Sequence, residues 1–199
     1  MANYATRDQV KAALRITDNI DDDLIDIAID AASREIDAYT ERTFALSTAT
    51  RVYTPTDSFL TEIDDLYTLT TLKTSSDGSS FDTTWSSSDY QLEPLNGIAG
   101  GISQPYTRIR AIGDYLFPVW DTKNPNAYEA TVQITGVWGW STVPSAVKQA
   151  CILYSMRQYK RYDAPLGVAG FGDIGAINIT RIDPDVMALL QPFRRVRMA

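Results

Sequence analysis

The sequence of residues 132–144 is VQITGVWGWSTVP, and a long helical pattern follows it. Residues 132–135 alternate between apolar and polar side chains, which is typical of a half-buried strand. The two glycines let the chain bend where side chains would clash, and the two tryptophans supply large apolar anchors beside the bend. Pro144 suits the first turn of a helix, because the N–H that proline lacks has no partner there. The stretch predicts a strand, a Gly/Trp turn and a helix.

Four helices are expected around this stretch. Thr6 and Gln9 have the spacing of a capping box, which predicts a short helix from there to residue 14. Asp21 to Asp23 form an acidic helix start, and apolar residues then recur every three or four positions to Tyr39. The long central helix spans about 144–161, and its mostly apolar middle predicts deep burial. Asp183-Pro184 begins a short helix through residue 190.

Residues 48–135 are rich in Thr, Ser, Tyr, Val and Ile, which predicts short antiparallel strands. The expected strands are 50–54, 67–74, 90–93, 107–112 and 128–135. Ser75-Ser76-Asp77-Gly78 is a turn signal, and Asp64-Asp65 and Asp82 are also interpreted as turn residues.

The predicted fold class is α+β. We expect a small, mainly helical domain with a short N-terminal helix, two long helices and a short C-terminal helix. It carries an inserted antiparallel β subdomain and an extended C-terminal arm. The expected segments of this single folded unit are N-terminal helices at 1–47, the β insert at 48–135, the Gly/Trp turn and central helix at 136–163, and a Gly-rich loop, short helix and arm at 164–199.

Composition narrows the function classes. The 199 residues contain no histidine, which removes the commonest general base and metal ligand. A net charge of −7 argues against tight nonspecific binding to nucleic acid. The only cysteine, Cys151, has apolar neighbours and is expected to be a buried hydrophobe. No apolar run is long enough to span a bilayer, and residues 1–7 lack the apolar core of a secretory signal, so we expect a soluble protein made in the cytoplasm.

Several patterns resemble catalytic or binding motifs only in part. Residues 170–175 match a dinucleotide fingerprint, but they follow a helix instead of a strand, so we expect a mobile loop. Residues 19–30 begin like a calcium loop, yet Leu24 replaces the required glycine and Asp30 the bidentate glutamate. We therefore expect no cofactor, no metal and no catalytic site.

The segment Phe193-Arg194-Arg195-Val196-Arg197 has the composition of a docking arm. Phe193 and Val196 are apolar, and the three arginines can form forked hydrogen bonds with carboxylates. The acidic residues instead gather near the N-terminus: between Asp18 and Asp37 only Arg34 is basic. The arm is the strongest candidate for a binding site.

An ordered series of segments resembles the head-tail connector (adaptor, head-completion) proteins of long-tailed double-stranded DNA phages. The series comprises YATRDQVKAALR at 4–15, AASREIDAYT at 31–40 with Arg42 and Phe44, TRVY at 50–53, the Gly/Trp turn through Pro144, Lys160-Arg161, DPDV at 183–186 and LLQPFRR at 189–195.

The resemblance implies a structural protein, not an enzyme. Such proteins assemble as a ring, usually of twelve copies, beneath the portal after DNA packaging. By this resemblance Phe193, Arg194, Arg195 and Arg197 bind the portal, and the β insert offers a surface to the next connector or tail component. The acidic helix faces either the DNA channel or a neighbouring copy, and DNA only passes through. The expected location is the virion, after assembly in the host cytoplasm, with no membrane partner.

Two alternative hypotheses assign the protein to other functional classes. Trp85, Trp120, Trp138 and Trp140 are able to form a platform for a small ligand or carbohydrate, which makes a binding β module the second hypothesis. Abundant Asp and Glu leave open a third, a carboxylate-dependent hydrolase, although an exposed acidic helix face is the commoner use of such residues.

Overall fold

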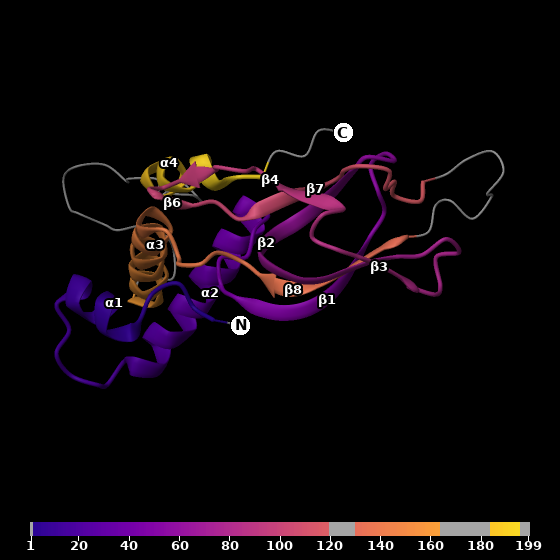
Figure 1. The fold of residues 1–199 in the computed structure, drawn as a ribbon. Helices are drawn as coiled ribbons and strands as arrows, with labels where there is room; N and C mark the ends of the chain where they lie inside the picture. The colour runs from indigo at the N-terminus through magenta and orange to yellow at the C-terminus, as the bar shows by residue number, and fades with distance from the viewer. Residues whose placement is uncertain (1, 120–129, 164–183, 196–199) are drawn as a thin grey trace. The chain divides into compact units, whose positions relative to one another are not determined.

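The computed structural model describes residues 2–119, 130–163 and 184–195 (Figure 1). The chain divides into two compact units, and each is described by itself. The helical unit contains Met1–Arg42 and Val143–Ala199, and the sheet unit contains Thr43–Thr142. The predicted segment boundaries at 1–47, 48–135, 136–163 and 164–199 stay a prediction. The Gly-rich fingerprint at 170–175 lies outside the described residues.

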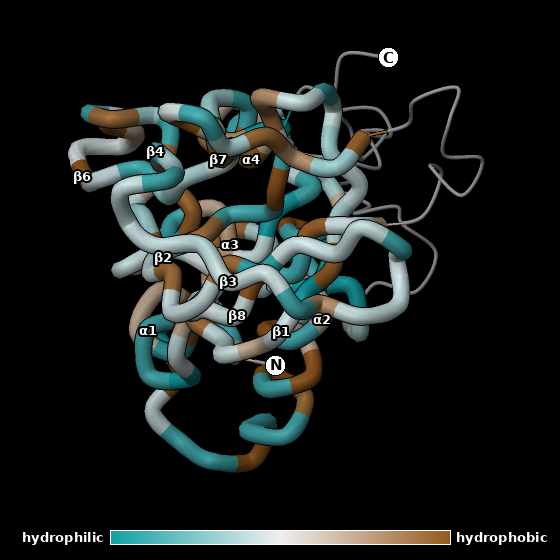
Figure 2. The backbone as a smooth tube through the Cα atoms, turned by 45° about the vertical axis from the view of Figure 1, so that its right-hand side comes forward, coloured by the Kyte–Doolittle hydropathy of each residue, from teal (hydrophilic) through white to brown (hydrophobic). Residues whose placement is uncertain are grey.

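The helical unit consists of α1 (Arg7–Leu14), α2 (Asp22–Thr40), α3 (Ser145–Asp163), α4 (Pro184–Leu190) and the 3₁₀ turn η1 (Gln191–Phe193). The predicted capping box is present: Gln9 N donates to Thr6 Oγ1, and Thr6 N donates to Gln9 Oε1. Polar and apolar stretches follow one another along α2 (Figure 2). No helix among the described residues is long and apolar enough to cross a membrane.

The core of the helical unit lies between α2 and α3. Both helices bury small and branched side chains, namely Ile25, Ala28, Ile29, Ala32 and Ile36 from α2 and Val147, Ala150 and Cys151 from α3. Cys151 is fully buried, as expected, and its Sγ lies 3.5 Å from Ser33 Oγ. Burial raises the pKa of this thiol, which keeps it protonated and unreactive.

The sheet unit is built on six antiparallel strands in the order β1-β8-β2-β7-β4, with β3 paired to β2. A separate two-stranded hairpin, β5-β6, joins β4 to β7. The bounds are β1 (Ser47–Tyr53), β2 (Leu60–Thr74), β3 (Thr83–Trp85), β4 (Tyr90–Glu93), β5 (Ile98–Ala99), β6 (Ile102–Ser103), β7 (Tyr106–Ala111) and β8 (Val132–Trp138).

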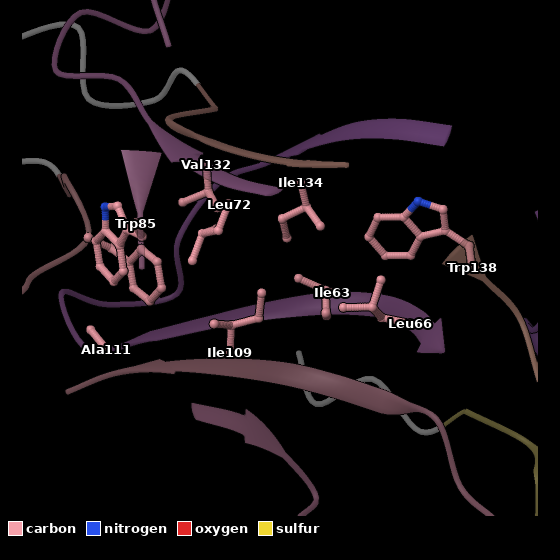
Figure 3. Packing of buried hydrophobic residues seen from close by; sticks show 10 residues of the cluster. Ile63, Leu66, Leu72, Trp85, Ile109, Ala111, Val132, Ile134 and Trp138 are labelled. Atoms are coloured by element: carbon pink, nitrogen blue, oxygen red, sulfur yellow. The ribbon is translucent and has the colours of Figure 1, made fainter. Parts of the chain in front are cut away.

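The long strand β2 bends, so that the two halves of the sheet enclose an apolar core. Its register shifts between Glu62 and Leu66 against β7, and twice more between Leu66 and Thr71 against β8. Such irregularities bend and twist a strand. Figure 3 shows Leu72, Val132 and Ile134 pointing toward Ile63, Leu66 and Ile109, with Trp85 and Trp138 at opposite ends of the cluster.

The Gly/Trp segment closes one end of the sheet unit. Gly139 has a φ of +110°, and a Cβ added there would lie 2.3 Å from the carbonyl oxygen of Ala45. Trp140 Nε1 donates to the buried carboxylate of Asp65 at 2.8 Å, and Gly139 N donates to Asp65 O at 2.8 Å. Phe44 packs against Trp140 with 5.4 Å between ring centroids. Glycine is therefore required at 139 for both space and conformation.

The predicted fold class is wrong. The chain is not a mainly helical domain, because it contains, in addition to short helices, a large antiparallel sheet of six strands that forms a compact unit of its own. The sequence pattern predicts a turn at Asp64-Asp65, but both residues lie inside β2, which is therefore longer than expected. The two carboxylates are tolerated there because Arg51 and Tyr53 donate to Asp64 and Trp140 donates to Asp65.

Candidate functional site

The C-terminal segment folds onto the helical unit through Arg195. Phe193 is only 3% exposed and lies in η1, so the predicted extended arm does not begin at this residue. Arg42 Nε donates to Phe193 O at 2.7 Å, and Arg195 N donates to Thr40 O at 2.9 Å. The second bond satisfies a carbonyl at the end of α2, where no helical partner is available. Residues 193–195 are thereby fixed to the end of α2.

Two of the predicted portal-binding arginines lie in this fixed segment. Arg194 is exposed, and its guanidinium carbon lies 5.7 Å from the centre of the Tyr39 ring. Arg195 is half-buried. Arg197 lies outside the described residues. The structure therefore brings Phe193, Arg194 and Arg195 together at the end of α2, with the aromatic ring inward and the Arg194 side chain outward.

A pocket of about 230 Å³ opens in the helical unit between α2, α3 and α4. Its lining is almost wholly apolar and comprises Glu35, Ile36, Ala38, Tyr39, Tyr154, Val186, Met187 and Leu190. Sequence reasoning missed this pocket. The apolar spacing of Val186 and Leu190 marks one face of α4, but nothing in the pattern shows that α4 leaves space against the other two helices.

Most of the acidic residues on and before α2 are engaged in ion pairs or hydrogen bonds. Arg7 bridges Asp22 and Asp26, and Lys11 Nζ lies 2.7 Å from Asp22. The hydrogen bond from Lys11 lowers the pKa of Asp22, and that from Arg7 lowers the pKa of Asp26. No cluster of Asp, Glu or Cys in the described ranges is arranged to hold a metal ion.

Asp37 differs from the other acids on α2. Burial raises its pKa, although Tyr4 donates a hydrogen bond to it and Arg34 Nη1 lies 2.6 Å away. Tyr4 N also donates to Ser33 Oγ at 3.2 Å. The acidic segment therefore holds α1 and the N-terminal residues against α2.

The tryptophans give no ligand platform among the described residues. Trp85, Trp138 and Trp140 are all buried. Trp85 stacks on Phe117 at 4.7 Å between ring centroids and donates to Thr74 Oγ1, while Trp138 donates to Ala49 O. Trp120 lies outside the described residues. The three placed indoles support the core, which removes the main observation behind a carbohydrate-binding module.

Residues 4–82 match the family model of the phage gp6-like head-tail connector proteins. Over these residues the chain is similar to the phage head-tail connector proteins. The match covers α1, α2, β1 and β2, and the resemblance inferred from the sequence is thus confirmed. The family is one of structural connectors, so this connector is not an enzyme. No curated protein matches its sequence.

Solved structures with a similar fold cover more of the chain than the family match does. A chain from the neck of an empty GTA particle, computed with C6 symmetry, matches with a TM-score of 0.59 at 19% identity. The match covers 97% of the present chain and 90% of the neck chain. A chain from the neck of the native GTA particle, computed with C12 symmetry, has a TM-score of 0.52 at 19% identity, with 97% and 92% covered. A chain from the virion of the native gene transfer agent particle has a TM-score of 0.51 at 20% identity, with 97% and 88% covered.

Proposed function

We propose that this connector assembles as a ring of twelve copies beneath the portal of a DNA-filled phage head, and that it provides the docking surface for the next connector or tail component. The observation that carries the proposal is the likeness of 97% of the chain to a chain in the neck of a GTA particle. The C6 and C12 symmetries with which those neck structures were computed support a closed ring. The proposed location is the virion, after assembly in the host cytoplasm.

The C-terminal segment is the proposed portal contact. Arg194, Arg195 and Arg197 would pair with carboxylates of the portal, since arginine forks recognise carboxylates through two parallel hydrogen bonds. Phe193 would contribute by anchoring the arginines, because its ring is buried in the helical unit. DNA would only pass through the ring, and a net charge of −7 disfavours its adhesion.

Cosedimentation with portal-bearing, DNA-filled heads tests this proposal. Wild-type connector should pellet with the heads in a saturable manner. The triple variant Arg194→Ala, Arg195→Ala, Arg197→Ala should bind more weakly and with a smaller salt dependence, because fewer charges are paired on docking. The matched control is Lys160→Ala with Arg161→Ala, which removes exposed positive charge from the end of α3. Equal binding by the triple variant would move the portal contact elsewhere.

A further inference from the structure

The β5-β6 hairpin lies in an uncharged segment between β4 and β7, residues 94–105. Residues 94–105 contain no Asp, Glu, Lys or Arg, although 22% of the chain is charged. The hairpin is well defined: Ile98 pairs with Ser103, and Gln104 N donates to Gly97 O at 2.8 Å. Gly100 and Gly101 both have positive φ values and form its tip. The segment is therefore held by backbone hydrogen bonds and is a regular hairpin.

Two large apolar side chains of this segment, one of them on the hairpin, are exposed to solvent. Leu95 is 64% exposed and Ile98 is 75% exposed. Figure 2 shows apolar, brown segments of the backbone beside the label β6. Exposed apolar side chains that gather in one segment, without charge around them, are typical of a docking surface.

The pocket between α2, α3 and α4 is apolar and therefore suits an apolar side chain such as that of Ile98. Ile36, Val186 and Leu190 form buried apolar walls, while Tyr39 and Met187, which also line the pocket, are only half-buried. Its volume of about 230 Å³ is sufficient for a branched aliphatic side chain. Glu35 is exposed and supplies the charged group among the lining residues.

We propose that the β5-β6 hairpin of one copy inserts the side chain of Ile98 into the α2-α3-α4 pocket of the next copy. This inference rests on the proposed ring and names the contact that closes it. The two surfaces differ, so the contact is head-to-tail, and repeated contacts of that kind generate a ring when the rotation closes. A second copy is the favoured occupant because the uncharged hairpin can approach another chain of net charge −7 with little repulsion.

Cysteine pairs test the contact directly. Ile98→Cys and Ala38→Cys each place one accessible thiol, at the hairpin and at the pocket, while the native Cys151 is buried. The two variants are mixed, bound to DNA-filled heads and oxidised. In the control mixture, the Ile20→Cys variant takes the place of the Ile98→Cys variant. Ile20 is 86% exposed but lies in the loop between α1 and α2. Covalent dimers should be about tenfold more abundant in the first mixture, since docking raises the local thiol concentration.

The double variant distinguishes neighbours from contacts within one chain. With both Ile98→Cys and Ala38→Cys in every copy, we expect a ladder of covalent multimers on heads. Loss of both free thiols without multimers would show that the hairpin occupies the pocket of its own chain, which overturns the proposal. Connector that binds heads but yields no more dimer than the Ile20→Cys control also overturns it, while the proposed function stands.

The same mixtures are oxidised free in solution at high protein concentration. Selective dimers there support the hairpin contact even if binding to heads fails, in which case only the proposed function is lost. Absence of selective dimers both on heads and in solution rejects the contact.

Discussion

The sheet unit and the helical unit use their apolar residues in different ways. The sheet unit closes its core with large aromatic rings and with backbone groups that leave no room for a side chain at Gly136 or Gly139. The helical unit packs small residues between α2 and α3 but leaves an apolar pocket where α4 joins them. Changes inside the sheet unit should therefore cost stability, whereas changes at the pocket should act on assembly.

Gly139→Ala should have the largest effect on stability. The new Cβ meets the Ala45 carbonyl at 2.3 Å, and the φ of +110° is strained for alanine. We expect a loss of about 4 kcal/mol from strain and overpacking together. Gly101→Ala is the control, because its φ is also positive but nothing lies within 4 Å of an added Cβ. Urea unfolding followed by tryptophan fluorescence measures both, and equal losses would contradict the steric account.

Phe193→Ala should lower the stability of the helical unit by about 3 kcal/mol, as expected for a buried aromatic side chain. Arg194→Ala, one residue further on, should change it by less than about 0.5 kcal/mol because that side chain is exposed. Circular dichroism during urea unfolding measures the two variants. Native-like stability of Phe193→Ala would show that residue 193 belongs to a detached arm.

Trp140→Phe should cost about 2 kcal/mol, because it removes a hydrogen bond to the buried Asp65 carboxylate. Trp85→Phe provides the comparison, since the lost acceptor there is the neutral hydroxyl of Thr74 and the expected cost is about 1 kcal/mol. Both keep an aromatic ring in the core. Chemical denaturation of the two variants should reproduce this order, and the reverse order would contradict the larger cost assigned to the hydrogen bond with Asp65.

The smallest effect concerns pH and the α1-α2 ion pairs. Asp22 and Asp26 have lowered pKa values, so their stabilisation is present above the ordinary Asp pKa and is lost as the pH falls through the folded-state values. Asp37 has the opposite sign: its raised pKa means that ionisation weakens the fold as the pH rises. Arg7→Gln should lower the urea midpoint at pH 7 more than at pH 3. A constant difference would exclude linkage to these carboxylates.

The sequence predicts local structure better than it predicts the long-range arrangement of the strands. Thr6 and Gln9 form the expected capping box because both partners lie within one helical turn. Residues 90–93 form a strand as expected. Asp64 and Asp65 lie in a strand and not in the expected turn, because their partners Arg51, Tyr53 and Trp140 are distant in sequence. The bend of β2, the strand order and the fold class depend on such partners.

The candidate site shows the same limit. The composition of residues 193–197 singled out the C-terminal segment, but did not show that Phe193 turns inward. That placement depends on hydrogen bonds from Arg42 to Phe193 and from Arg195 to Thr40, which join segments far apart in the sequence. The pocket was missed because it arises from the packing of three helices.

The number of connector copies bound per DNA-filled head tests the central claim most directly. Heads saturated with connector are purified by sedimentation, and the ratio of connector to portal is measured by quantitative gel analysis, with images of the portal vertex as a check. A closed ring predicts saturation at a fixed number near the twelvefold symmetry of the similar neck, with ring density beneath the portal. Heads that bind no connector, or that bind it without saturation and without density at the portal, would contradict the account.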